Sequence, residues 1–153
     1  MSRIKKILLV FLLAFIAIQF VHPARNKGSN EQPADFAKVF PVPAAIQSIF
    51  QNACYDCHSN NTNYPWYSSV QPIDWMMARH INNGKAKLNF SFFGSNSQRK
   101  QISKLKEMVN QLKDDEMPLS SYKLMHSKAR LSHQEITLLT GWLTATADSL
   151  QNK

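Results

Sequence analysis

The feature that most constrains this chain is a five-residue string that holds both of its cysteines, Cys54-Tyr55-Asp56-Cys57-His58. Two thiols three positions apart can each add across one vinyl group of a haem, and a histidine directly after the second thiol is then held beneath the iron. Such a chain must fold around a large flat group, because the thiols and the imidazole have to reach it together. The string predicts one covalently attached haem c, with Cys54 and Cys57 binding the porphyrin and His58 ligating the iron.

The N-terminus is typical of an export signal. Arg3, Lys5 and Lys6 precede an apolar run over residues 7–20 that only Gln19 interrupts. A basic flank of this kind stays on the cytoplasmic side of the inner membrane, so the rest of the chain is predicted to be exported to the periplasm or its equivalent.

Residues 1–23 are therefore expected to be a signal peptide or a membrane anchor. The apolar run is shorter than the ~20 residues of a comfortable membrane span, and Pro23-Ala24 is a mediocre cleavage context. Both outcomes stay open on this evidence. If the segment is not cleaved, residues 7–21 anchor the protein to the inner membrane.

The remainder has the composition of one globular domain. The chain has 153 residues, of which 44% are hydrophobic, enough for a real core. We expect a linker over residues 24–40 and a c-type haem-binding domain over residues 41–153. The net charge of +8 suits either a solvated surface or a docking face for an acidic redox partner or anionic lipid. An export signal argues against nucleic acid as a partner.

Apolar spacing predicts four helices and no strand. We expect segments 87–94 and 119–130 to be loops, so the predicted fold class is all-α. The four expected helices are a short one opening near Pro43 and delivering Cys54, one over 72–82 that stops at Gly84, one over 97–112, and one over 133–150 capped by Ser132 and Glu135.

Aromatic residues follow the string closely and are candidates for the haem pocket. Tyr64, Trp66 and Tyr67 can pack on a porphyrin face or reach a propionate, although such residues also serve as ordinary core and surface aromatics.

The sixth iron ligand is a separate question. Met117 is our first candidate, because Pro118 stiffens the chain directly after it. His80, predicted on the apolar face of its helix, is the alternative distal ligand. An open site also remains possible, as do Met125, His126 and His133.

The arrangement of these residues resembles the small exported haem-binding domain family of bacteria, which is similar to class I cytochrome c. The resemblance implies a cytochrome c-like domain of about four helices wrapped around one haem, after an N-terminal apolar helix. It also implies Met117 as distal ligand. The matching positions are Cys54 to Ser59, Tyr64-Pro65-Trp66-Tyr67, Pro72, Trp75, His80, Gly84, Asn89-Phe90-Ser91, Glu116-Met117-Pro118, Tyr122, His126, Ala129, Leu131-Ser132, Glu135 and Trp142.

These observations favour a periplasmic monohaem cytochrome-like domain that passes single electrons to an unknown redox partner. Such a protein has no catalytic residues of its own. The alternatives are a haem-based ligand binder, sensor or peroxidase with an open sixth site, and a thiol–disulfide oxidoreductase using Cys54 and Cys57, around which no thioredoxin-like strand pattern is found. Zinc held by Cys54, Cys57, His58 and His80 is a weaker alternative, because adjacent Cys57 and His58 seldom reach one tetrahedral ion.

Overall fold

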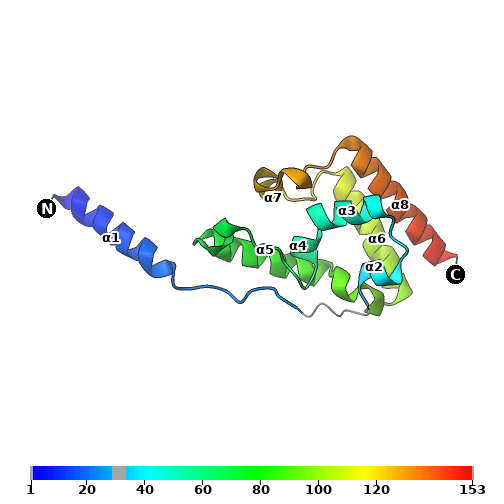
Figure 1. Cartoon of the computed structure of the whole chain (residues 1–153), viewed down its shortest axis with the longest axis horizontal. Coiled ribbons are helices and arrows are strands. Elements are labelled where there is room, and N and C mark those ends of the chain that lie inside the picture. The colour runs from blue at the N-terminus through cyan, green and yellow to red at the C-terminus, as the bar shows by residue number, and fades with distance from the viewer. Residues whose placement is uncertain (1, 29–33, 153) are drawn as a thin grey trace.

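The computed structural model describes residues 2–28 and 34–152, and within them the chain is all-helical, as predicted. One isolated antiparallel bridge, between Lys27 and Asn61, is the sole β feature of the described residues. Figure 1 shows a bundle of helices with one further helix, α1, projecting away from it. The helices are α1 (Arg3–Ile18), α2 (Phe36–Val39), α3 (Ala44–Ala53), α4 (Tyr55–His58), α5 (Ile73–Lys87), α6 (Gln98–Lys113), α7 (Ser120–Met125) and α8 (His133–Gln151).

The four predicted helices correspond to α3, α5, α6 and α8, and their ends follow from local chemistry. At the start of α8 the Ser132 side chain accepts a hydrogen bond from the Glu135 N–H, and the Glu135 carboxylate accepts one from the Ser132 N–H at 2.8 Å. This reciprocal capping box confirms the predicted start of the last helix. α8 packs along α6.

The core lies between these helices and is rich in phenylalanine. Phe36, Phe50, Phe90 and Phe93 are fully buried. Their rings meet at steep angles, for example 88° between Phe36 and Phe93 at a centroid distance of 4.9 Å. Edge-to-face contacts of this kind add to the free energy of burial. Leucines on α6 and α8 close the other side of the core: Leu105, Leu112, Leu139 and Leu143.

The segment predicted as a linker contributes to this core. α2 lies inside residues 24–40, and Asp35 caps it by accepting a hydrogen bond from the Ala37 N–H at 3.0 Å. Phe36 follows directly and is completely buried. A single turn of helix has no apolar period to detect, which is why the sequence pattern missed it. The domain boundaries themselves stay predictions.

Three further sequence expectations were wrong in detail. α5 does not stop at Gly84 but runs through it to Lys87. The segments expected as loops hold short helices instead: a 3-10 helix, η2 (Phe90–Ser95), in the first, and α7 with a 3-10 helix, η3 (Ser127–Ala129), in the second. Elements of three to six residues are too short to show periodicity.

The face of α5 that is buried also differs from the one predicted. Ile73, Met76, Met77 and His80 are half-buried or exposed, whereas the buried residues of α5 are Asp74, Ile81 and Gly84. A buried aspartate has to be paired, and the partners of Asp74 come from the N-terminal segment, which the pattern within α5 cannot reveal.

The N-terminal apolar helix is present as α1, and none of its residues is buried. A 3-10 helix, η1 (Trp66–Ser69), and the start of α5 lie at the end of the domain nearest to α1 in Figure 1. Among the described residues, no helix combines the length and the apolar character needed to cross a membrane.

Candidate haem site

The cysteine string lies at the junction of two helices. Cys54 ends α3 with a non-helical φ of −126° and ψ of −45°, and the single turn α4 begins at the next residue. The N–H groups of Cys57 and His58 both donate to the Cys54 carbonyl, at 3.2 and 3.0 Å. This tight turn holds the backbone of Cys54, Cys57 and His58 together, and all three residues are half-buried.

Both thiols are free, and their surroundings hold them in the protonated form. Burial raises the pKa of Cys54 to about 12, with a further contribution from the charge of Cys57. Burial also raises the pKa of Cys57 to about 11, assisted by the charge of Asp56. At neutral pH neither side chain is a thiolate.

His58 is held in one orientation by two backbone carbonyls of α5 and the residue that follows it. Its Nδ1 lies 3.1 Å from the Gly84 oxygen and 3.0 Å from the Leu88 oxygen. A carbonyl oxygen only accepts, so Nδ1 carries the proton and Nε2 keeps its lone pair. Burial lowers the pKa of His58 despite these hydrogen bonds, and nearby Lys87 lowers it further. A neutral imidazole with a fixed, unprotonated Nε2 is the form that ligates iron.

Gly84 allows α5 to approach α4 closely enough for these hydrogen bonds. A Cβ atom at position 84 would lie 2.6 Å from the Cys57 carbonyl oxygen and 3.3 Å from its carbonyl carbon. Both contacts are with backbone, which cannot rotate away. The glycine that the sequence indicated as a helix stop is therefore a packing residue directly behind the string.

A polar network from α7 reaches the string from another direction. The Tyr122 hydroxyl donates to the Asp56 carboxylate at 2.6 Å, and its ring stacks on His126 with centroids 4.0 Å apart. The His126 Nε2 lies 3.2 Å from the Tyr67 hydroxyl. Burial raises the pKa of Tyr122, and so do the Asp56 hydrogen bond and the charges of Asp56 and Cys57.

Sequence reasoning did not assign a role to Tyr122 or Asp56. Asp56 is one of the two variable positions in the Cys-x-x-Cys-His pattern, so the pattern gives it no role. Tyr122 lies on α7, which was expected to be a loop. Tyr122 was marked by the family resemblance alone, whereas His126 belonged to that resemblance and was also among the possible sixth ligands.

The three predicted aromatic residues have different environments. Tyr67 belongs to the polar network beside the string, whereas Trp66 is 83% exposed. The Tyr64 hydroxyl accepts a hydrogen bond from the Asn26 N–H at 2.8 Å, and the Arg25 guanidinium lies 4.4 Å from the centre of its ring. Tyr64 is thus held by the N-terminal segment, and contact of these aromatics with a haem stays a prediction.

The candidates for the sixth ligand lie on different elements. Met117 is half-buried in the turn between α6 and α7, where its N–H donates to the Gln111 carbonyl at 3.2 Å. His80 is half-buried on α5, one turn before Gly84 and on the same face of that helix. Met117 as distal ligand, with His80 as its alternative, stays a prediction.

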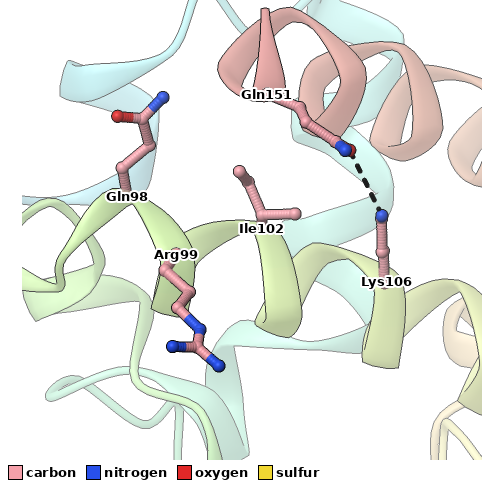
Figure 2. Close-up of a pocket in the computed structure, with 5 residues that line it drawn as sticks. All are labelled: Gln98, Arg99, Ile102, Lys106 and Gln151. Carbon is pink, nitrogen blue, oxygen red and sulfur yellow. Dashed lines mark hydrogen bonds between the residues drawn. The ribbon is translucent and has the colours of Figure 1, made fainter.

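Two surface depressions formed by described residues lie away from the string. Figure 2 shows one between the start of α6 and the end of α8, where the Lys106 Nζ lies 3.4 Å from the Gln151 side-chain oxygen. A second depression lies farther along the same two helices. Neither depression is lined by a residue of the string. We therefore define the candidate haem site by the thiols and the imidazole of the string and not by a cavity.

The donor groups fit a haem better than a bare metal ion. Two protonated thiols and an oriented neutral imidazole supply one axial nitrogen and two groups able to form thioether bonds. In the part of the chain that the structure describes, no three or more His, Cys, Asp or Glu side chains are arranged to hold a metal ion. The zinc site considered above is therefore not formed by Cys54, Cys57, His58 and His80.

Comparison with known proteins agrees with this reading. Residues 13–145 match the family described as "Haem-binding domain", a range that begins within α1 and ends within α8. Neither a search of curated proteins nor a search of solved structures found a match. Because the match covers most of the chain, the protein belongs to the haem-binding domain family.

Proposed function

We propose that this haem-binding protein is an exported monohaem c-type cytochrome that carries single electrons. The observation that carries the proposal is His58, whose Nδ1 lies within hydrogen-bond distance of the carbonyls of Gly84 and Leu88 and which shares one short turn of backbone with two free cysteines. Metal-ligating histidines are typically fixed in this way through their other ring nitrogen. When bound, the haem supplies a centre that accepts and releases one electron.

Each residue of the string has a separate task in this proposal. Cys54 and Cys57 would each hold the haem through a thioether: an S–C and a C–H bond would form for the S–H bond and the C=C π bond lost, without net oxidation. His58 would ligate the iron. The Nδ1 hydrogen bonds would raise its basicity as a ligand, and the ring of Phe90 lies beside it, with the two ring centres 6.2 Å apart.

The polar network on α7 supports a second candidate function. Tyr122, His126 and Tyr67 bring hydroxyl and imidazole groups next to Asp56 within the string. Hydrogen-bond donors beside an open iron site favour binding or activation of a small ligand over electron transfer. A sensor or peroxidase with an open sixth position is therefore the alternative to the carrier.

The thiol–disulfide alternative has less support. A reactive cysteine needs a lowered pKa, because the thiolate is the nucleophile. Here the pKa values of Cys54 and Cys57 are raised to about 12 and about 11. These thiols are poor nucleophiles at neutral pH.

Production of the full chain in a host with cytochrome maturation machinery tests the proposal. We expect a haem stain that survives boiling in denaturant and that is lost in the Cys54→Ser, Cys57→Ser double variant. A stain removed by denaturant in the unaltered protein would contradict covalent attachment.

Absorption spectra of the oxidised and reduced protein then separate the two functions. A methionine–iron charge-transfer band that disappears in Met117→Ala, and persists in His80→Ala, supports a closed site and electron transfer. Rapid uptake of carbon monoxide by the reduced, unaltered protein would instead favour the ligand binder.

A further inference from the structure

The residues that follow α1 are an integral part of the folded domain. Residues 19–28 run along η1 and the start of α5, and we call them the docked segment. The Gln19 side chain accepts a hydrogen bond from the Gln71 N–H at 2.9 Å. The Val21 carbonyl accepts two more, from the Gln71 side-chain amide at 2.7 Å and from the Trp75 indole N–H at 3.0 Å. Gln71 is 1% exposed with the docked segment in place, so its two hydrogen bonds to the segment are shielded from water, whereas the Trp75 hydrogen bond is exposed.

The docked segment also pairs a buried charge. Asp74 is 1% exposed. Its carboxylate lies 2.8 Å from the His22 Nδ1 and 3.7 Å from the Arg25 guanidinium. Arg25 also donates to the hydroxyls of Ser68 and Ser69, at 3.1 and 3.0 Å. A buried carboxylate without partners is strongly unfavourable. Cleavage at Pro23-Ala24 would remove both His22 and the Val21 carbonyl from the folded domain.

Several exposed apolar side chains lie on the residues that follow α1 and on the elements that the docked segment contacts. These side chains lie at residues 20–21, on η1, in the turn after η1 and in the first turn of α5. Trp66 and Phe20 are more than 80% exposed, and Trp75 is tied to the docked segment by its indole N–H. We call this group of side chains the apolar patch: Phe20, Val21, Trp66, Val70, Trp75 and Met76.

We propose that the N-terminal segment is retained and that the apolar patch rests on the surface of a lipid bilayer. Two tryptophans at the base of an apolar helix are typical of the membrane interface, where their rings are amphipathic. α1 has 16 residues, about 24 Å of helix, which falls short of a typical hydrocarbon core of about 30 Å. α1 alone is thus too short to cross the bilayer, and in this proposal the apolar patch enters the interface at one end while Arg3, Lys5 and Lys6 extend to headgroups at the other, which together make up the missing length of about 6 Å.

This arrangement fixes the haem site relative to the membrane and does not depend on haem attachment. The start of α5 lies at the bilayer, and the carbonyl of Gly84 that holds His58 lies eleven residues farther along that helix. Eleven residues correspond to about 16 Å along the axis of α5. The redox centre is then held outside the bilayer and close to its surface. There it can exchange electrons with a partner embedded in the same bilayer or with one that docks from solution.

The mass of the intact protein tests retention of the segment. The full chain is produced in an exporting bacterial host, extracted from its membranes with detergent and weighed by mass spectrometry. We expect a mass that includes residues 1–23. A mature protein that begins at or after residue 23, recovered without detergent, would overturn the proposal even if it carries haem.

Contact of the patch with lipid is tested with a photocrosslinking amino acid. Benzoyl-phenylalanine is placed at Trp66, and at Leu138 of α8 as a control with an exposed apolar side chain outside the patch. Both full-length variants are reconstituted in vesicles of phosphatidylethanolamine and phosphatidylglycerol and irradiated. We expect at least tenfold more lipid adduct at position 66 than at 138. Equal labelling at the two positions, or crosslinks at 66 to another copy of the protein and none to lipid, would overturn the proposal.

Discussion

At the scale of single residues, the contact between Gly84 and the backbone of Cys57 limits what can occupy position 84. We predict that Gly84→Ala lowers the free energy of unfolding by about 1–3 kcal/mol, because the new Cβ would overpack the crossing of α4 and α5. The Cβ would lie 2.6 Å from the Cys57 carbonyl oxygen. Denaturant unfolding measures the change, and haem loading should fall with it, because His58 binds the same turn of α5.

Gly141→Ala is the matched control for that prediction. Gly141 lies inside α8, and a Cβ at this position meets no atom within 4 Å. Alanine should therefore stabilise the protein by up to about 1 kcal/mol through helix propensity alone. Equal effects of the two substitutions would contradict the packing role of Gly84.

The sequence predicted a haem-binding protein, and the roles that it assigns to single residues stay predictions. The spacing of Cys54, Cys57 and His58 fixes which atoms can meet a haem, and their clustering in the structure follows from one turn of backbone. The orientation of His58 was not predictable, because its partners are main-chain oxygens 26 and 30 residues away. Every residue has a backbone carbonyl, so the sequence does not show which carbonyl groups bind His58.

At the scale of elements, the long helices were predictable and the short ones were not. α6 and α8 carry apolar residues at helical spacing over four or more turns, and Ser132 with Glu135 marks where α8 begins. α7 has fewer than two turns and is held by Tyr122, whose hydroxyl donates a hydrogen bond to Asp56, 66 residues away in the sequence. Tertiary contacts of this kind decide short elements, and local patterns do not record them.

The start of α8 gives a prediction at the same scale. Ser132→Ala should lower the free energy of unfolding by about 1 kcal/mol at pH 7, because the Glu135 N–H loses its acceptor. Glu135 adds a pH dependence. Hydrogen bonds from the Ser132 N–H and hydroxyl hold the pKa of Glu135 below its usual value of 4.5. The contribution of the Glu135 carboxylate to the free energy of unfolding is therefore complete above about pH 4.5. It is lost as the pH falls through the lower pKa that Glu135 has in the folded protein.

Unfolding curves at a series of pH values check both parts. The stability difference between the unaltered protein and Glu135→Gln should shrink as the solution becomes more acidic than pH 4.5. A difference that grows on acidification would show that the carboxylate is not held in its ionised form by the capping box.

At the scale of the whole molecule, the link between the N-terminal segment and the haem domain bears on whether residues 1–23 are cleaved or retained. Sequence alone left residues 1–23 undecided between a signal peptide and an anchor, because both share the same basic flank and apolar run. The structure adds a long-range observation: the His22 Nδ1 lies 2.8 Å from the carboxylate of Asp74, which is 52 residues away in the sequence and is buried on α5.

We predict that His22→Ala lowers the free energy of unfolding of the full chain by about 1–3 kcal/mol, the range found when a buried charged group loses a hydrogen bond. Arg25 and the Gln71 amide, at 3.7 and 3.3 Å from Asp74, limit the loss without replacing the bond. His133→Ala is the control, because His133 is exposed and its removal should change stability by less than about 0.5 kcal/mol. Denaturant unfolding of the detergent-solubilised protein measures both. If His22→Ala matches the control, the bond between His22 and Asp74 contributes nothing to the attachment of residues 19–28. If it does not, cleavage at Pro23-Ala24 would remove the same bond, and a domain that keeps residues 1–23 would be the more stable form.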